Sequence, residues 1–336
     1  TINKSSDYFN TKLYTGNGSN GHAITGVGFQ PDFVWIKDRD TATNHMVTDA
    51  VRGATKTLHT QNTDVESTAV NALSSFNTDG FTVNTDTDLN ANNKKNVAWN
   101  WKANGAGSAN TEGSVSATVS ANTTAGFSIV QYNTAGSGTQ TMGHGLDSAP
   151  TFIITKPTQN SESWYVYIPT GVSSSLRLNT TAAAVSSTPY AGTPTDTLFS
   201  INNGVIGGYT GVISYCFTDV KGYSKFGSYT GNGNADGPFV YTGFKPAFVM
   251  VKESSSTGSW CIFDNKRLGY NPNNPRLYPN NAGAEDASET IFDIVSNGFK
   301  IRGDQSDTNA SGQTYIYAAF AEAPLVGTNN VPCTAR

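Results

Sequence analysis

Short apolar stretches separated by glycine- and asparagine-rich turns run along the whole chain of 336 residues. The stretches either alternate between apolar and polar residues or are apolar throughout, and a turn follows roughly every ten residues. Asn-Gly, Asp-Gly and Asn-Asn-Gly sequences supply the positive φ that hairpin turns need. This pattern predicts an all-β fold of antiparallel sandwiches. Residues 64–75 are the best helix candidate and fit equally well a loop leading into a strand at Phe76.

One block of sequence occurs three times. VGFQPDFVWIK (27–37) returns as LDSAPTFIITK (146–156) and as TGFKPAFVMVK (242–252). In each copy a proline is followed two positions later by phenylalanine, and the block ends in lysine. The proline comes just before the predicted strand, where its missing N–H costs nothing. A tyrosine with a glycine-rich turn precedes each block, at Tyr14, Tyr132 and Tyr229.

Three more landmarks keep the same order in every copy. They are a second strand (45–53, 164–171 and 260–269), a phenylalanine with an Asn/Asp-Gly turn (76–81, 199–204 and 292–299) and a closing apolar strand (96–103, 212–219 and 315–323). Five landmarks repeated in one order predict three tandem antiparallel β-sandwich units, joined end to end, of about 100 residues each.

The landmarks also place the unit boundaries. We predict unit 1 at residues 1–103, a divergent unit 2 at 127–225 and unit 3 at 226–327, with a C-terminal tail at 328–336. Residues 104–126 are small and polar, which predicts a linker. The alternation at 115–119 leaves room there for one extra edge strand.

Composition and net charge argue against nucleic acid and membranes as partners. Aromatic residues make up 11% of the chain, which indicates a folded protein, and charged residues only 14%. The net charge of −4 gives no electrostatic reason to bind nucleic acid. No apolar run approaches the roughly 18 residues that span a bilayer, so no membrane association is expected. The N-terminus shows no secretory signal and no initiator methionine, so the chain is either processed or part of a longer protein.

Cysteines and histidines give no pattern of a metal or disulfide site. Three cysteines at wide spacing form neither a disulfide framework nor a zinc site, and Cys216 and Cys261 are predicted to be buried small hydrophobes. No two histidines have metal-ligand spacing, and solvated loop or turn positions are predicted for all of them. The residues are Cys216, Cys261, Cys333, His22, His45, His59 and His144.

One stretch matches a nucleotide-binding motif in its residues but not in its predicted structural context. Gly16–Gly21 matches G-x-G-x-x-G, but a strand rather than a helix follows, and Asp236 replaces the last glycine in the third copy. A hairpin turn is the better interpretation.

Paired carboxylates could serve a glycosidase without any local motif. Nothing singles out a pair, and Ile168 stands near the position that Asp49 and Asp264 occupy in the other copies. We therefore predict no catalytic residues, no cofactor and no enzymatic activity. The candidate carboxylates for such a pair are Asp38, Asp40, Asp49, Asp264, Glu285 and Asp286.

A calcium loop is the strongest metal hypothesis. Asp86, Asp88 and Asn90 resemble the start of such a loop, but Ala91 stands where glycine is needed and no bidentate glutamate follows. Asp304, Asp307 and Asn309 lie in the matching loop of unit 3. Solvated turn residues, and no metal, are predicted at both places.

Tryptophans fall at the repeat landmarks, in strand-like runs, which favours the core over a binding face. Trp99 and Trp101 share one face of a strand and must both point inward or both form an exposed patch. The other three are Trp35, Trp164 and Trp260. The polar loops between the strands suit adaptable recognition, although no ligand-binding residue can be singled out.

The repeat as a whole resembles a known group. Y-T-G-N-G, G-F-x-P-x-F-V-x-x-K, a D-x-x-R turn, F-x-x-x-G-F and a closing A-W-x-W-K-A or A-A-F-A-E-A-P are similar to the repeat modules of virion structural and tail-fibre-like proteins of marine tailed bacteriophages. The resemblance implies jelly-roll or concanavalin-like sandwiches, a place in a virus particle assembled in the host cytoplasm, and other virion proteins as partners. It carries no catalytic residues.

The resulting hypothesis is a non-enzymatic tail-fibre-like or surface component of a virion that binds a host receptor or glycan. A homo-oligomer is expected, a trimer if the protein is a fibre. One alternative is a capsid decoration or tail-assembly protein that binds only its neighbours. Another is a carbohydrate-active enzyme or a bacterial adhesin.

Overall fold

Antiparallel β-sheets make up almost all of the regular structure. The computed structural model describes residues 2–168, 174–272, 275–323, 325–326 and 332–333. The predicted all-β class is confirmed, since the helices described are single turns. They are η1 (Ser5–Asp7), α1 (Thr87–Asn90), α2 (Asn203–Ile206) and α3 (Ser306–Asn309). Residues 64–75 are not helical and lead through a short strand to a strand that contains Phe76.

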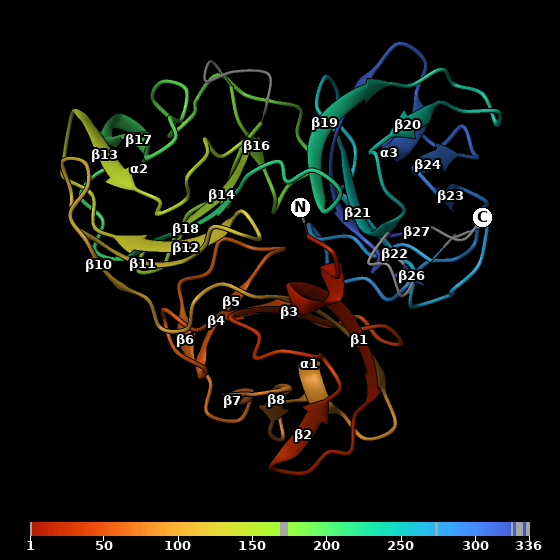
Figure 1. Ribbon diagram of the computed structural model, residues 1–336, viewed down its shortest axis with the longest axis horizontal. Helices are drawn as coiled ribbons and strands as arrows, with labels where there is room; N and C mark the ends of the chain where they lie inside the picture. Colours follow the sequence, from red (N-terminus) through yellow and green to blue (C-terminus); the bar gives the residue numbers. More distant parts are fainter. Residues whose placement is uncertain (1, 169–173, 273–274, 324, 327–331, 334–336) are drawn as a thin grey trace.

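The first part of the chain, residues 2–103, forms two sheets (Figure 1). The larger has the strand order β1-β9-β3-β4-β5-β6 and the smaller β2-β8-β7. The strands are β1 (Phe9–Thr15), β2 (His22–Thr25), β3 (Phe33–Asp38), β4 (Met46–Asp49), β5 (Lys56–His59), β6 (Ser67–Thr68), β7 (Leu73–Asn77), β8 (Gly80–Val83) and β9 (Lys95–Trp101).

The middle part, up to residue 217, forms a seven-stranded sheet β10-β11-β12-β18-β14-β15-β16 and a pair β13-β17. The strands are β10 (Ser108–Asn110), β11 (Ala117–Asn122), β12 (Phe127–Tyr132), β13 (Thr139–Gly143), β14 (Phe152–Pro157), β15 (Tyr165–Tyr167), β16 (Leu176–Arg177), β17 (Leu198–Asn202) and β18 (Val212–Phe217). Residues 104–126, predicted as a linker, contribute two strands, and β11 pairs with β12.

The last part forms a four-stranded sheet β19-β25-β21-β22, a three-stranded sheet β20-β24-β23 and a pair β26-β27. The strands are β19 (Ser224–Thr230), β20 (Phe239–Tyr241), β21 (Pro246–Glu253), β22 (Cys261–Asp264), β23 (Phe292–Val295), β24 (Gly298–Ile301), β25 (Thr314–Ala321), β26 (Leu325–Val326) and β27 (Pro332–Cys333). We call these three parts the first, second and third segments.

Each closing strand lies in the middle of its large sheet. β9 pairs with β1 and β3, β18 with β12 and β14, and β25 with β19 and β21, all antiparallel. The strand that follows each repeated proline is thus always the neighbour of a closing strand. Strands in these inner positions are largely apolar because both of their faces are buried, and polar residues within them, such as Asn96, Asn100 and Ser214, are buried too.

Alternate residues of these strands face two different cores. In β3, Val34 and Ile36 belong to the core of the first sandwich, between its two sheets, whereas Phe33 and Trp35 belong to a second core shared by all three segments. Inner cores of the same kind lie in the second and third segments. This two-sided burial explains the β-sandwich character and the continuous apolar runs together.

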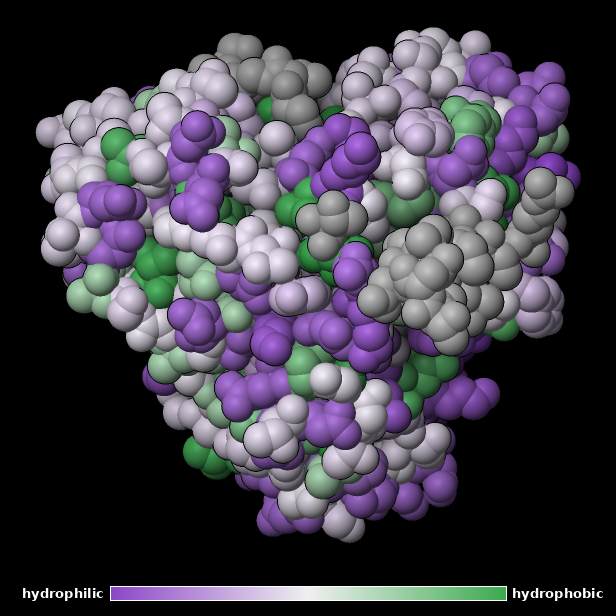
Figure 2. All heavy atoms as spheres, in the orientation of Figure 1, coloured by the Kyte–Doolittle hydropathy of each residue, from purple (hydrophilic) through white to green (hydrophobic). Residues whose placement is uncertain are grey.

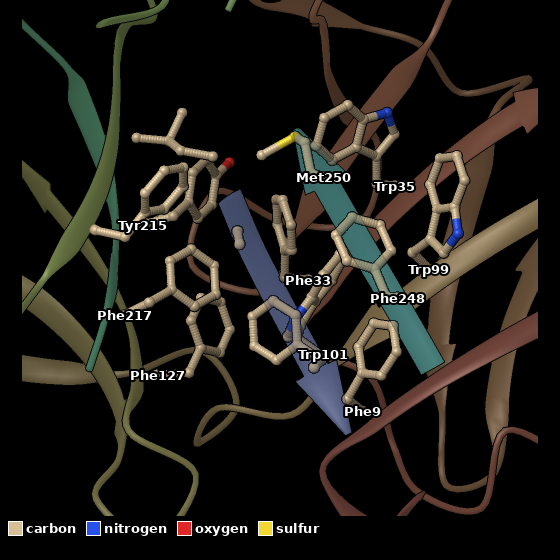
Figure 3. Close-up of a cluster of buried hydrophobic side chains, with 14 of the residues drawn as sticks. Phe9, Phe33, Trp35, Trp99, Trp101, Phe127, Tyr215, Phe217, Phe248 and Met250 are labelled. Carbon is tan, nitrogen blue, oxygen red and sulfur yellow. The ribbon is translucent and has the colours of Figure 1, made fainter. Parts of the chain in front are cut away.

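The shared core is rich in aromatic rings, and the three large sheets surround it (Figure 1). We call it the central core. Figure 3 shows side chains from all three segments pointing toward one another, among them Phe9, Phe33 and Trp101, then Phe127, Tyr215 and Phe217, then Phe248 and Met250. The sequence predicted tandem units but not how they pack, and in the structure the segments close around one centre. Each closing strand carries large apolar residues on its second face, and only a common core buries all three such faces.

Candidate functional site: the junction of the three segments

Two buried aspartates organise turns at the ends of β4 and β22. Asp49 accepts hydrogen bonds from the backbone N–H groups of Val51 and Arg52 through Oδ1, and from Arg52 Nε through Oδ2 at 2.5 Å. Asp264 does the same with the N–H groups of Lys266 and Arg267 and with Arg267 Nε at 2.6 Å. The side chains of both ion pairs are at most 1% exposed. The ion pair of each D-x-x-R turn is therefore almost completely desolvated.

Each aspartate also accepts a hydrogen bond from a different segment. Tyr215 Oη of the second segment donates to Asp49 Oδ2 at 2.7 Å, and Trp99 Nε1 of the first segment donates to Asp264 Oδ2 at 3.0 Å. These two carboxylates, which the sequence offered as catalytic candidates, thus join neighbouring segments.

At the junction of the second and third segments, the position equivalent to these buried hydrogen bonds is apolar. Strand register makes Trp99, Tyr215 and Ala318 equivalent positions of the three closing strands, since their partners are Trp35, Ile154 and Met250. Alanine cannot donate a hydrogen bond, so the third segment has no donor at this position. The second segment has Ile168 near the position of the two aspartates. Ile168 and Ala318 are both buried in the central core. Donor and acceptor are missing from the same junction, so no carboxylate is left buried there without a partner.

Glutamates extend the two polar junctions. Glu66 pairs with Arg52 Nη1 at 3.2 Å, and Glu285 pairs with Arg267 Nη1 at 3.1 Å. Glu285 also binds Arg39 of the first segment in a bidentate pair, with contacts of 2.9 and 2.8 Å. Such fork-to-fork geometry is the strong form of an arginine–carboxylate contact.

A ring of backbone hydrogen bonds links the segments. Glu66 N–H donates to Thr158 O at 2.7 Å, Ala184 N–H donates to Ser254 O at 2.9 Å, and Glu285 N–H donates to Arg39 O at 2.9 Å. The first segment is bonded to the second, the second to the third and the third back to the first. The junction is therefore closed by main-chain contacts as well as by side chains.

Tryptophans at the start of β15 and β22 reinforce this ring. Trp164 Nε1 donates to His59 O of the first segment at 2.8 Å, and Trp260 Nε1 donates to Arg177 O of the second segment at 3.0 Å. All five tryptophans are buried in the central core, as the sequence predicted, and Trp99 and Trp101 both point inward.

Two histidines are not the solvated loop residues that the sequence predicted. His45 and His144 are completely buried, and burial lowers the pKa of both. His45 precedes β4 as Trp164 precedes β15, and its Nδ1 accepts a hydrogen bond from Trp35 Nε1 at 3.0 Å. It is a structural residue of the junction. His22 and His59 are partly exposed but also differ from the prediction, because they lie in the strands β2 and β5 and not in loops.

The repeated lysine at the end of each proline block is buried as well. Lys37, Lys156 and Lys252 are all 0% exposed, and their ammonium groups bind backbone carbonyls. Lys156 reaches Thr63 O of the first segment at 3.3 Å, and Lys252 reaches Thr181 O of the second segment at 3.3 Å. Burial lowers the pKa of each of the three lysines to about 8.

We expect these lysines to make the fold more stable as the pH rises from about 8 to about 9. Unfolded lysines keep their protons to about pH 10.4, so in this range the unfolded chain binds more protons than the folded chain and the free energy of unfolding increases. Burial raises the pKa of the Cys216 and Cys261 thiols, which offsets part of the gain above about pH 8.5, where unfolded thiols ionise. Thermal melting at half-unit pH steps measures the slope.

A lysine variant serves as the control for this pH dependence. Lys252→Met removes one of three similar groups and should reduce the lysine contribution to the slope by about one third. A melting temperature that falls steadily from pH 8 to pH 9 in the unmodified protein would contradict the prediction.

The remaining carboxylates of the candidate pool are held in local contacts. Asp38 accepts the backbone N–H groups of Asp40 and Thr41, and Asp40 accepts Lys95 N–H. Asp286 binds Arg276 at 2.6 Å. Each of these three carboxylates is thus engaged in a local turn or ion pair.

The suggested calcium loops are organised by asparagine instead. Asn90, buried at the end of α1, holds the loop at residues 16–21 by donating to Asn17 Oδ1 and Ser19 O. Asn309 holds residues 232–234 in the same way. Asp86 caps α1, and Asp307 accepts Ser259 N–H. Within the described part of the chain, no three His, Cys, Asp or Glu side chains gather as a metal site would require.

The G-x-G-x-x-G sequence is also not the hairpin turn that was predicted. It connects β1 of the large sheet to β2 of the small sheet, and these two strands do not pair with each other. The Asn90 side chain hydrogen-bonds the backbone of this loop, accepting from Asn17 N–H and donating to Ser19 O.

Sequence reasoning missed the partners of the junction, which lie far away in the chain. Tyr215 is 166 residues from Asp49, and Trp99 is 165 residues from Asp264. The alignment of His45 with Trp164 and Trp260 was the one available signal. It places His45 at a position that is buried in the other two copies. Cys216 and Cys261 are buried and free, as predicted.

None of the helices in the described residues is long and apolar enough to cross a membrane. No curated protein and no solved structure matches the sequence. One family does match, over residues 4–324, and its description is "Domain of unknown function (DUF7483)". Because that match covers nearly the whole chain, the protein belongs to the DUF7483 family.

Proposed function

We propose that the three segments are three tandem jelly-roll or concanavalin-like sandwich units. The five repeated sequence landmarks support this proposal. The equivalent pairing of β9, β18 and β25 and the cyclic backbone bonds also support it. In this arrangement one chain forms a closed ring of related units, and each unit keeps its own inner core and contributes one face to the central core.

The function that fits best is a non-enzymatic structural protein of a tailed-phage virion, at a tail-fibre-like or surface position where it binds a host receptor or glycan. One observation carries the proposal: the buried carboxylates Asp49 and Asp264 accept hydrogen bonds that join the segments, so they have a structural role. A rigid ring that exposes polar loops is suited to presenting a recognition surface. The resemblance to marine phage modules supplies the virion setting.

Binding of the purified, fluorescently labelled protein to marine host bacteria tests the proposal. We expect host-restricted binding that disappears when surface polysaccharide is stripped enzymatically, because a surface receptor is then removed. An unrelated β-sandwich protein of similar charge, labelled in the same way, is the control.

Absence of binding to every host tested would contradict the attachment role and favour a decoration or tail-assembly role. The homo-trimer expected of a fibre stays a prediction, which light scattering coupled to size-exclusion chromatography measures as three chain masses.

A further inference from the structure

Two aromatic side chains stand out on the outer sheet of the third segment. Phe239 is 49% exposed and Tyr241 is 66% exposed, whereas Val240 between them is buried in the inner core. Successive residues of a strand point to opposite faces, so both rings lie on the outer face of β20. Hydrophobic residues on the face seen in Figure 2 are scattered in small patches. A pair of neighbouring exposed rings therefore requires an explanation.

The fold does not require aromatic residues at these two positions. In the first segment, Ile24 pairs with Phe81 and Thr25 with Gly80, as Val240 pairs with Phe299 and Tyr241 with Gly298. This register places Phe239 and Tyr241 where the first segment has Ala23 and Thr25. The same sheet geometry is thus built with two small residues.

A glycine seats one of the two rings on the sheet. A Cβ on Gly298 would lie 2.0 Å from Val240 O, and one on Gly80 would lie 2.0 Å from Ile24 O, so close backbone approach requires glycine in both sheets. In the third segment the Phe239 ring lies beside this glycine, since its edge would be 3.2 Å from that Cβ. Gly298 is buried, and Phe239 keeps about half of its surface exposed.

The charges around the rings neutralise one another. Lys300, which pairs with Phe239 across the strands, binds Asp236 Oδ1 at 2.6 Å and Gly237 O at 2.5 Å. Arg302 lies 3.6 Å from Asp293. The face thus has two cations and two anions in pairs, and it favours an uncharged ligand with hydroxyl groups over a charged one.

We propose that Phe239 and Tyr241 form a binding platform for a neutral glycan, with the apolar faces of the sugar rings against the aromatic rings and the sugar hydroxyls toward Tyr241 Oη and the Asp236–Lys300 pair. The proposal rests on the proposed function and names the ligand class and its site. Tyrosine suits such a surface because it combines an apolar ring with a polar tip.

Affinity electrophoresis through gels containing dextran, laminarin or mannan tests the platform, with alginate as the anionic comparison. The test variant is Phe239→Ala combined with Tyr241→Thr, which installs the residues of the first segment. The control is Tyr270→Ala, because Tyr270 is 68% exposed in the same segment and lies outside this sheet. We expect at least one neutral polysaccharide to retard the unmodified protein, and binding to fall at least tenfold in the double variant alone.

The outcomes separate this site from the proposed function. Retardation by alginate only, no retardation by a neutral polysaccharide, or equal retardation of the double variant would overturn the platform. Polysaccharide-dependent binding of the double variant to host cells at the unmodified level would overturn it too, while leaving the attachment role intact. Self-association that the double variant abolishes, measured by sedimentation velocity, would assign the face to a second copy of the chain and overturn the glycan proposal.

Discussion

Replacing Asp49 with alanine is expected to lower the free energy of unfolding by about 3–5 kcal/mol. The substitution leaves the Arg52 guanidinium, 1% exposed, without the carboxylate that binds its Nε at 2.5 Å. Tyr215 Oη, also buried, loses its acceptor in the first segment. Glu66 still pairs with Arg52 Nη1, but Arg52 Nε and Tyr215 Oη are left buried without their acceptor, and a buried donor without a partner is far more costly than the loss of one surface contact. Urea unfolding followed by the fluorescence of the buried tryptophans measures the effect.

An exposed ion pair provides the control for Asp49. Asp7 binds Lys4 at 2.6 Å with side chains 47% and 63% exposed, so Asp7→Ala should change the free energy of unfolding by at most about 1 kcal/mol. If Asp49→Ala proved as mild as Asp7→Ala, the junction would not depend on the desolvated turn, and the structural role assigned to this carboxylate would be wrong.

The sequence predicted the parts of the fold that depend on local pattern. Runs such as residues 33–36 are apolar at every position, and the structure buries both of their faces. The repeated landmarks placed the tryptophans in strands, where the structure finds all of them in or next to β-strands. Periodicity along one strand is sufficient for such inferences.

The arrangement of the segments could not be predicted in this way. A strand that is apolar on both faces predicts a core on each side of its sheet. It does not predict that three segments share one of these cores. The hydrogen bonds that decide it, such as Tyr215 to Asp49, join residues from different copies of the repeat. His45 was misjudged because the polar residues Thr43 and Asn44 precede it, whereas it is buried against Trp35, ten positions away in the chain.

The exposed aromatic pair illustrates the opposite case. Phe239 and Tyr241 alternate with Val240, which is an ordinary half-buried strand pattern with the polar positions replaced by aromatic ones. Only the register against β24 shows that they point outward at positions where the first segment has Ala23 and Thr25.

Replacing Trp101 with alanine is the second substitution with a large expected effect. Its ring lies 4.9 Å from Phe9, 5.7 Å from Phe248, 5.5 Å from Phe320 and 6.5 Å from Phe217, measured between centroids, so it touches all three segments. We expect a loss of about 3–5 kcal/mol in the free energy of unfolding, from lost burial and from the cavity left in the central core. Urea unfolding followed by circular dichroism measures it.

Phenylalanine at the same position should be tolerated much better. Among the described residues, Trp101 Nε1 is buried without a hydrogen-bond partner, which costs the native protein about 1–3 kcal/mol. The equivalent positions opposite Phe152 and Phe248 are occupied by Phe217 and Phe320. Trp101→Phe loses ring volume but also removes this cost, so we expect stability within about 1 kcal/mol of the unmodified protein.

Trp99→Phe is the matched comparison, because Trp99 Nε1 donates to Asp264 and that bond would be lost from a desolvated ion pair. It should cost about 1–3 kcal/mol more than Trp101→Phe. Equal stability of the two phenylalanine variants would mean that the hydrogen bond from Trp99 Nε1 to Asp264 does not contribute to stability. The ordering Trp101→Ala, then Trp99→Phe, then Trp101→Phe, from least to most stable, is what a ring joined by hydrogen bonds around an apolar centre requires.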